Sequence, residues 1–244
     1  MPQTILITGA SRGIGRAAAR LFAGRGWQVA VNYLHSGQQA AELCAELCRA
    51  GGKAAPVQAD VSVRADVERM VARIDDLFGG VDVLVNNAGI DGQKLFTDIT
   101  DEEWNRIVAV DLTGVFYCCQ AVLPHMIHQK KGRIINLSSI WGLTGGSCEV
   151  HYSAVKAGVI GLTKALAKEL GPSHIQVNCV APGVIDTEMN AALSEADRAA
   201  LREETPLMRL GTPREVAEAI YFLAGEGGSF FTGQVLSPNG GFVI

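Results

Sequence analysis

Several features that mark other protein classes are missing from this 244-residue chain. It has no stretch rich in Gly and Ser or in Pro, so nothing marks a linker between domains. It also has no apolar run approaching the ~20 residues that span a bilayer, and Met1-Pro2-Gln3 leads directly into a predicted strand without a signal peptide. Length alone allows two small domains, but we expect one cytoplasmic domain over residues 1–244, with no membrane association.

The cysteine and charge patterns exclude further classes. The six cysteines show neither a disulfide framework nor the spacing of a zinc knuckle. Cys44 and Cys48 lie one helical turn apart, where packing is the better interpretation of two small side chains. His125 and His128 share a helix face without a third ligand nearby in sequence, so we expect no metal. The net charge of −4 argues against nucleic acid as a partner, although a local basic patch stays possible.

Apolar strand-like runs alternate with longer amphipathic stretches along the whole chain, which is typical of βαβ units around a parallel sheet. The sequence therefore predicts an α/β fold, a Rossmann-type doubly wound parallel sheet of about seven strands flanked by helices on both faces. The expected strands are near Thr4–Thr8, Gln28–Asn32, Lys53–Gln58, Val81–Asn86, Gly132–Ser139, Gln176–Ala181 and Gln234–Ser237.

Three longer segments carry helix patterns. Asp101–Lys130 begins with acidic and ends with basic residues, as a core-packing helix should. Tyr152–Leu170 carries apolar residues at three- and four-residue spacing, so one face is predicted to be buried. Residues 184–211 lack strand character and contain a polar helix pattern around Ser194–Glu204, which indicates a substrate lid.

A glycine-rich segment follows the first predicted strand and opens a helix. Glycines let the backbone turn tightly and approach a pyrophosphate, while free N–H groups at the helix start stabilise negative charge. Such a match alone also fits an ordinary turn, but its position after the first strand favours a dinucleotide site. The residues expected to bind there are Gly9, Ser11, Arg12, Gly13, Ile14 and Gly15.

The spacing Gly-xxx-Gly-x-Gly resembles that of the short-chain dehydrogenase/reductase family, and the resemblance extends along essentially the whole chain. Asp60-Val61 looks like the family's adenine-contacting pair, and Asn86-Asn87-Ala88-Gly89 like its cofactor-side turn. Pro182-Gly183 with Thr187 is similar to its segment beside the nicotinamide. The resemblance therefore implies cofactor contacts from Asp60, Val61, Asn87, Ala88, Gly89, Pro182, Gly183 and Thr187.

The choice of nicotinamide cofactor depends on the end of the second strand, where an acidic residue would bind the ribose 2′-hydroxyl and repel a 2′-phosphate. That end reads Val31-Asn32-Tyr33, and no Asp or Glu occurs between Gly15 and Glu42. Arg12 can pair with a phosphate, and Asn32 is expected to contact the cofactor. We therefore predict NADPH/NADP+; the alternative is that Arg12 is only a solvated loop residue and either cofactor binds.

Tyr152 and Lys156 are four residues apart in a predicted helix, which places them on one face. A nearby ammonium lowers the pKa of a phenol, so Tyr152 is a candidate general acid. Ser139 lies at the carboxyl end of the fifth strand, where open α/β sheets place ligands; Ser138 points to the opposite face and is interpreted as structural.

By the family resemblance, Ser139 would bind the substrate carbonyl and Tyr152 would deliver the proton. Lys156 would hold the nicotinamide ribose, so Tyr152 and Lys156 also count as cofactor contacts. The family usually has Asn at a fourth catalytic position, where this chain has Asp111. The backbone carbonyl there holds a water of the proton relay in the family, and an aspartate would raise the pKa of Lys156.

Within the family, the region from Gly132 to Pro182 looks most like 3-oxoacyl-acyl-carrier-protein reductases, which predicts a carbonyl reductase with a small-molecule or carrier-bound substrate. Lys130, Lys131 and Arg133 form a basic cluster for an acidic carrier or, equally, a solvated helix end. The loop Ser147–His151 instead resembles reductases acting on 5-aminopentanone-modified elongation factor P, with Glu149 meeting an amino group. Sugar and steroid dehydrogenases are further alternatives.

A non-catalytic NADP(H) sensor is the alternative of another class, but such proteins usually lose the Tyr or the Lys, and both are present here. Homotetramers are usual in the family. The apolar tail from Phe230-Phe231 to Phe242-Val243-Ile244 fits an interface of a homotetramer or homodimer, although a half-exposed core edge has the same composition.

Overall fold

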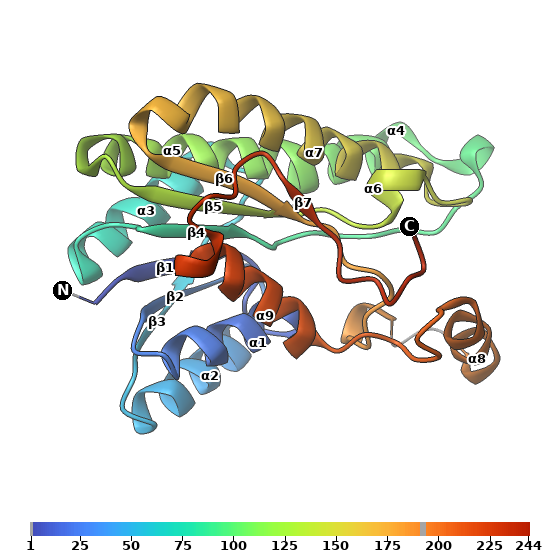
Figure 1. The fold of residues 1–244 in the computed structure, drawn as a ribbon, viewed down its shortest axis with the longest axis horizontal. Coiled ribbons are helices and arrows are strands. Elements are labelled where there is room, and N and C mark those ends of the chain that lie inside the picture. The colour runs from blue at the N-terminus through green and yellow to red at the C-terminus, as the bar shows by residue number, and fades with distance from the viewer. Residues whose placement is uncertain (1, 191–193) are drawn as a thin grey trace.

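The structure, a computed structural model, describes residues 2–190 and 194–244. Its centre is one parallel sheet of seven strands in the order β3-β2-β1-β4-β5-β6-β7 (Figure 1), which confirms the predicted fold class. All seven predicted strands are present, with ends that differ by at most two residues: β1 Thr4–Ile7, β2 Gln28–Tyr33, β3 Lys53–Gln58, β4 Val83–Asn86, β5 Gly132–Leu137, β6 Ile175–Val180 and β7 Val235–Leu236.

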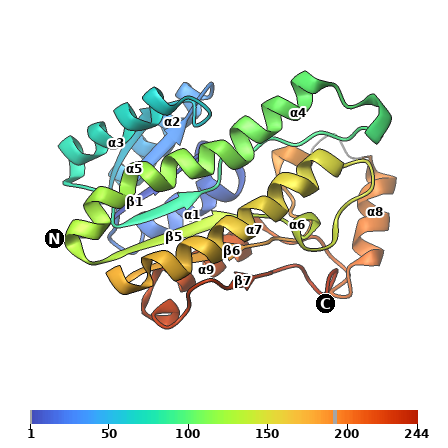
Figure 2. The same cartoon turned by 90° about the horizontal axis from the view of Figure 1, so that it is seen from above.

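Helices cover both faces of this sheet, as the views of Figures 1 and 2 show. One face carries α1 (Gly13–Ala23), α2 (Gly37–Arg49) and α9 (Pro213–Ala224). The other carries α3 (Arg64–Phe78), α5 (Gly114–Gln129) and α7 (Val150–Leu170). Shorter helical elements are η1 Phe96–Asp98, α6 Trp141–Thr144, η3 Gly171–Ser173, η4 Glu188–Asn190, α8 Glu195–Glu204 and η5 Glu226–Gly228.

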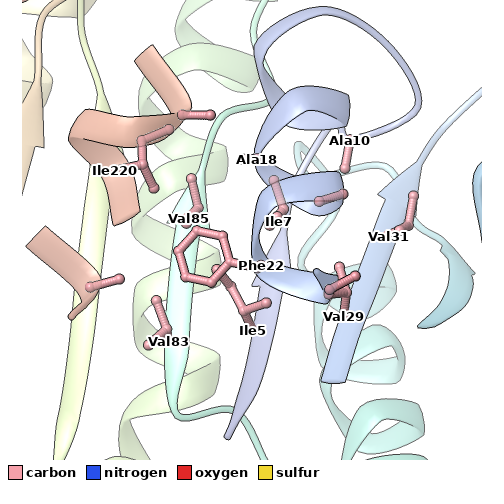
Figure 3. Close-up of a cluster of buried hydrophobic side chains, with 14 of the residues drawn as sticks. Ile5, Ile7, Ala10, Ala18, Phe22, Val29, Val31, Val83, Val85 and Ile220 are labelled. Carbon is pink, nitrogen blue, oxygen red and sulfur yellow. The ribbon is translucent and has the colours of Figure 1, made fainter. Parts of the chain in front are cut away.

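The strand side chains alternate between two apolar cores. Ile5 and Ile7 of β1 pack with Phe22 of α1 and Ile220 of α9 (Figure 3), whereas Leu6 points to the core beneath α3, α5 and α7. All of these side chains are completely buried. Since full burial of one such side chain is worth about 1.5–3 kcal/mol, the two cores fix the register of β1 between the helix layers.

The winding of the chain reverses at β1. Ile7 is paired with Val31 of β2 on one side and with Val85 of β4 on the other, so successive crossovers lead away from β1 in opposite directions. No crossover connection therefore passes over the carboxyl ends of β1 and β4, which leaves a crevice between them. In open parallel sheets, ligands bind in such a crevice.

The predicted helix Asp101–Lys130 is interrupted. α4 (Asp101–Val108) begins at a capping box of Thr100 and Glu103, and a π-helical turn, Ala109–Thr113, separates it from α5. The stretch Asp101–Gln129 is, against the sequence expectation, long and apolar enough to cross a membrane, with a mean hydropathy of 1.6 in its central window. Its side chains such as Val115, Val122 and Met126 are buried against the sheet, so it is a core helix.

The predicted lid, residues 184–211, leaves the body of the fold as a loop with joined ends. Ile185 and Gly211 form an isolated parallel bridge, and the Asp186 N–H donates to the Gly211 carbonyl at 2.9 Å. α8 begins at a capping box of Ser194 and Asp197 and contains no buried residue. Residues 191–193 lie outside the described residues.

Candidate active site

The carboxyl ends of β1, β4, β5 and β6 open into one cavity of about 740 Å³. Its volume lies within the range of small-molecule and cofactor sites. Every predicted catalytic or cofactor-binding residue lines this cavity except Gly15. The motifs that are far apart in sequence therefore meet at one edge of the sheet.

The glycines of the first loop are required by close backbone contacts. Gly9 has a φ of +61°, and a Cβ there would lie 2.9 Å from the Ala88 Cα. A Cβ on Gly15 would lie 2.8 Å from the Ala10 Cα, so Gly15 shapes the start of α1 rather than the cavity wall. A side chain at either position would push apart the closely packed backbone at the start of α1.

Thr8 and Asn87 join this loop to the segment after β4. The Thr8 hydroxyl accepts hydrogen bonds from the Asn87 and Ala88 N–H groups, both at 2.9 Å. The Asn87 amide in turn donates to the Thr8 carbonyl at 2.8 Å and the Gly9 carbonyl at 3.2 Å. The two loops thus form one hydrogen-bonded unit in the crevice between β1 and β4.

Asn32 lines the cavity, but its side chain has a structural task. It is 2% exposed, accepts from the Gly9 N–H at 3.1 Å, and donates to the carbonyls of Val57 and Ala59 at 3.3 and 3.2 Å. These hydrogen bonds link the glycine loop to the end of β3, and the predicted contact of Asn32 with a cofactor stays a prediction. The exposed side chain of Arg12 lies at the same end of the cavity, which Tyr33, Leu34, His35 and Ser36 also line.

Asp60, at the end of β3, is held as a carboxylate. Its Oδ1 accepts from the Ser62 N–H at 2.9 Å and from the Ser62 hydroxyl at 2.6 Å, and Arg106 lies 3.9 Å from Oδ2. Burial raises the pKa of Asp60, but the bonds from Ser62 and the Arg106 charge lower it more, so the net shift is downward. The cavity is thus anionic at this point.

Ser139, Tyr152 and Lys156 converge at the other end of the cavity. The Ser139 hydroxyl accepts from the Trp141 N–H at 3.2 Å, and the Lys156 ammonium lies 5.3 Å from the centre of the Tyr152 ring. Lys156 also donates to the Leu137 carbonyl at 3.3 Å. The neighbouring Ser138 donates to the Lys156 carbonyl at 2.9 Å, so the two serines point in different directions and Ser138 has the predicted structural role.

Asp111 is completely buried beside Lys156, where the π-helical turn directs it inward. Its Oδ2 is 3.0 Å from the Lys156 Nζ without hydrogen-bond geometry at that oxygen, so the attraction is chiefly coulombic. Its Oδ1 accepts from the Ile90 N–H at 2.9 Å. A Cβ on Gly89 would lie 2.6 Å from Oδ2, so glycine leaves the space that the carboxylate needs.

The charges around Tyr152 shift its pKa in opposing directions. Burial is the largest effect and raises the pKa of Tyr152, as do Asp111 and Glu149, whereas Lys156 and a hydrogen bond from Ser139 lower it. The net shift is upward. The effect of Lys156 has the predicted sign, but burial outweighs it. Burial lowers the pKa of Lys156, but Asp111 and Tyr152 raise it by more, so the net shift is upward and the ammonium form is retained.

Acidic side chains form part of the wall beside Tyr152. Asp91 and Glu149 both line the cavity, and the Gln93 amide donates to Glu149 at 3.3 Å. Burial raises the pKa of both carboxyls, and the Asp91 charge raises the pKa of Glu149 further. Sequence reasoning missed Asp91 and Trp141 as wall residues. The signal for both is position, since Asp91 lies two residues after the turn that follows β4 and Trp141 lies two residues after Ser139.

The basic cluster at 130–133 does not face this cavity. It lies at the amino end of β5, whereas Ser139 follows the carboxyl end, about 20 Å away at the rise of a parallel strand. The Arg133 guanidinium donates to the carbonyls of Leu223 and Gly225 and so caps the end of α9. Contact of this cluster with an acidic carrier stays a prediction, and the bonds of Arg133 to α9 give that side chain a structural role as well.

Comparisons with known proteins agree with this geometry. The sequence profile of the family described as "Enoyl-(Acyl carrier protein) reductase" matches residues 9–243. The chain is 43% identical to a 3-oxoacyl-[acyl-carrier-protein] reductase of Staphylococcus epidermidis over all of both chains. It is 44% identical to such a reductase of Synechocystis, over 99% of this chain and 97% of the relative.

A solved structure shows the same fold. The crystal structure of 3-oxoacyl-[acyl-carrier protein] reductase from Brucella melitensis superposes with a TM-score of 0.93 at 41% sequence identity, covering 99% of this chain and 92% of that one. The chain belongs to the short-chain dehydrogenase/reductase family.

Proposed function

We propose that this protein is an NADPH-dependent carbonyl reductase with an activity like that of 3-oxoacyl-[acyl-carrier-protein] reductases. The observation that carries the proposal is the convergence of Ser139, Tyr152 and Lys156 with the glycine loop in one cavity. The similarity to curated reductases over the full length of the chain supports the same reaction class. A cofactor sensor without catalysis is disfavoured because all three side chains are in place.

The residues present fit a nicotinamide dinucleotide. Glycine at positions 9 and 15 allows the close backbone contacts at the start of α1, where the helix N-terminus would stabilise a pyrophosphate. Arg12 supplies a guanidinium at the end of the cavity that the end of β2 also lines. β2 itself contains no Asp or Glu that would repel a 2′-phosphate. Bound in this way, NADPH supplies the hydride.

The protein's own groups then act on the carbonyl oxygen. Because Ser139 accepts a hydrogen bond from the Trp141 N–H, its own O–H is the donor, and this O–H can turn from Tyr152 to the substrate carbonyl. Tyr152 delivers a proton to the oxygen as negative charge develops there. Lys156, kept protonated by Asp111, stabilises the phenolate that remains.

Replacement of Tyr152 by Phe tests this assignment. The variant keeps the ring and the Lys156 neighbour but has no transferable proton, so we expect NADPH oxidation with an acetoacetyl thioester to fall by roughly a thousandfold or more. Fluorescence titration should show NADPH binding nearly unchanged, and wild-type kcat/KM should be higher with NADPH than with NADH. Retained turnover in Tyr152→Phe would refute the assignment of Tyr152 as the acid.

A specific observation also favours a second candidate substrate, an amino-ketone such as the 5-aminopentanone group on elongation factor P. Asp91 and Glu149 line the cavity wall on the side of Tyr152, and burial raises the pKa of both carboxyls even though the Arg12 charge acts on Asp91 in the opposite direction. An ammonium group on the substrate would be attracted to these carboxylates, whereas an anionic carrier would not.

The two substrates are separated by a direct comparison. Purified enzyme is assayed with NADPH on an acetoacetyl thioester and on a short ketone bearing a terminal amine. Higher kcat/KM for the thioester supports the first proposal. Higher kcat/KM for the amino-ketone, lost in Glu149→Gln, supports the second.

The proposal includes the setting of the enzyme. We infer a cytoplasmic homotetramer, or a homodimer, because such assemblies are usual in the family and several large apolar side chains are exposed on the surface. Residues 184–211 are proposed to cover the bound substrate, since the loop starts directly after Pro182-Gly183 in the cavity wall.

A further inference from the structure

We propose that Trp141 is the residue that limits the length of the substrate, by closing the cavity beside the reacting carbonyl. The inference rests on the proposed reductase function. Trp141 lies two residues after Ser139 and lines the same cavity as Tyr152. No step of the proposed reaction uses its indole, and its size makes it the largest side chain in that wall.

The backbone of Trp141 is fixed in the first turn of α6. Its N–H donates to the Ser139 hydroxyl at 3.2 Å. The next residue, Gly142, is packed so closely against α7 that a Cβ would lie 2.8 Å from the Lys156 carbonyl carbon and 2.5 Å from the Ser138 hydroxyl. The indole therefore leaves the chain at a set position relative to Ser139 and Lys156.

The indole itself is held from two further sides. A Cβ on Gly146, in the loop before Tyr152, would lie 3.0 Å from the Trp141 Cδ2, so this loop lies directly on the ring. Phe242 packs edge-to-face against the indole, with ring centres 5.8 Å apart and an interplanar angle of 85°. An aromatic side chain held in this way gains packing energy and loses rotamer freedom, so it acts as a rigid wall.

The C-terminal tail that carries Phe242 is tied to the base of the lid. The Leu207 N–H donates to the Gly240 carbonyl at 3.1 Å, and Gly241 lies against the Pro206 ring. Asn239 in the same tail packs on Gly183, where a Cβ would lie 2.8 Å from the Asn239 Cα. Because the tail is anchored at these points, Phe242 is held against the indole, and we expect that a long substrate does not push the indole aside.

A wall of this kind predicts a selectivity for short substrates. Each methylene that enters apolar space improves binding by about fourfold, so an open cavity would favour a long 3-oxoacyl chain strongly over a short one. With the indole in place, the extra methylenes find no space to enter. The wild-type enzyme should therefore reduce a ten-carbon 3-oxoacyl thioester no better than the four-carbon one.

The test uses Trp141→Ala and Trp141→Phe in the full-length protein, with NADPH oxidation measured on 3-oxoacyl N-acetylcysteamine thioesters of four and ten carbons. The ratio of kcat/KM for the long over the short substrate should rise on the order of tenfold or more in Trp141→Ala. Trp141→Phe, which keeps an aromatic partner for Phe242, should give a smaller rise in the same direction. Leu143→Ala is the matched control, because Leu143 lies in the same short helix but is 43% exposed.

An unchanged ratio in both Trp141 variants, with turnover of both thioesters retained, overturns the inference and leaves the reductase function standing. An equal rise in Leu143→Ala also overturns it, since the effect would then belong to the helix and not to the indole. If Trp141→Ala does not fold, the Phe variant alone decides by the same criterion. A wild-type enzyme that oxidises no NADPH with either thioester overturns the proposed function and this inference with it.

Discussion

The carboxylate of Asp111 changes the electrostatics of the site at the scale of a single residue. It is completely buried, lies 3.0 Å from the Lys156 ammonium and contributes to the raised pKa of Tyr152. A neutral amide in the same position would keep the hydrogen bond from the Ile90 N–H, because that bond needs only an oxygen acceptor. The charge and the position of this side chain can therefore be separated by experiment.

Asp111→Asn should shift the pH dependence of reduction to lower pH. Reduction requires the protonated phenol of Tyr152, so kcat/KM falls as the pH rises through the Tyr152 pKa. Since the Asp111 charge raises that pKa, its removal lowers it, and we expect the fall of kcat/KM to occur at lower pH in the variant than in the wild type. The measurement is kcat/KM for NADPH-dependent reduction as a function of pH.

Glu46→Gln is the control for this profile, because Glu46 pairs with Arg20 on the surface, away from the cavity. Its profile should match that of the wild type. A profile for Asp111→Asn that also matches the wild type would mean that the buried charge does not act on the proton donor.

At the scale of elements, a line of buried polar side chains sets the position of α7 on the sheet. The Asn86 amide donates to Asn136 at 2.9 Å, and the Asn136 amide donates to the Thr163 hydroxyl, also at 2.9 Å. Thr163 lies two helical turns beyond Lys156, and its hydroxyl donates to the Val159 carbonyl at 2.8 Å. The network joins β4, β5 and the helix that carries Tyr152 and Lys156.

Thr163→Val should destabilise the protein through this network. Valine fills the same space but leaves the buried Asn136 amide without its acceptor, which costs about 1–3 kcal/mol. For a chain of this size that corresponds to a fall of several degrees in Tm, about 2–4 °C for each kcal/mol. Thermal unfolding followed by circular dichroism measures the change.

Thr163→Ser keeps the hydroxyl and should lose much less stability than the valine variant. Equal Tm values for the serine and valine variants would show that the hydroxyl is not what stabilises the contact between α7 and β5.

The elements also show which features the sequence predicts and which it does not. Short apolar runs between longer amphipathic stretches predicted all seven strands, because burial of a strand on both faces leaves a local pattern. The π-helical turn at Ala109–Thr113 left no such pattern, since the apolar spacing continues through it and tertiary contacts of Asp111 accompany the change. Asn136 and Thr163 were also not predicted, because their partners come from distant strands and helices.

The site residues divide in the same way. Ser139, Tyr152 and the glycine loop lie at strand ends or at fixed spacing along one helix, so their common location in the cavity follows from the order of the motifs. The structural link made by Asn32 and the closeness of Asp91 to Glu149 depend on how separate loops pack together. Chain order contains no measure of those distances, so the sequence predicted neither the link made by Asn32 nor the closeness of the two carboxyls.

At the scale of the whole molecule, large apolar side chains remain exposed near the β7 edge of the sheet. Phe230 is fully exposed, and Phe231 packs edge-to-face on Phe222 with ring centres 5.3 Å apart while both stay partly exposed. β7 has only two residues and forms the end of the sheet. A cluster of exposed aromatic rings of this kind is costly in water and is typical of an interface between subunits.

Phe230→Asp should weaken the assembly, because a buried carboxylate without a partner opposes association and a symmetric interface contains the change in both subunits. Light scattering of the wild type should give the mass of four chains, or of two, and the variant should give a smaller species at the same concentration. Val63→Asp is the matched control, since Val63 is also an exposed apolar residue, at 44%, but lies after β3 at the opposite edge of the sheet. A wild-type monomer, or equal dissociation in both variants, would show that these aromatic rings do not form an interface between subunits.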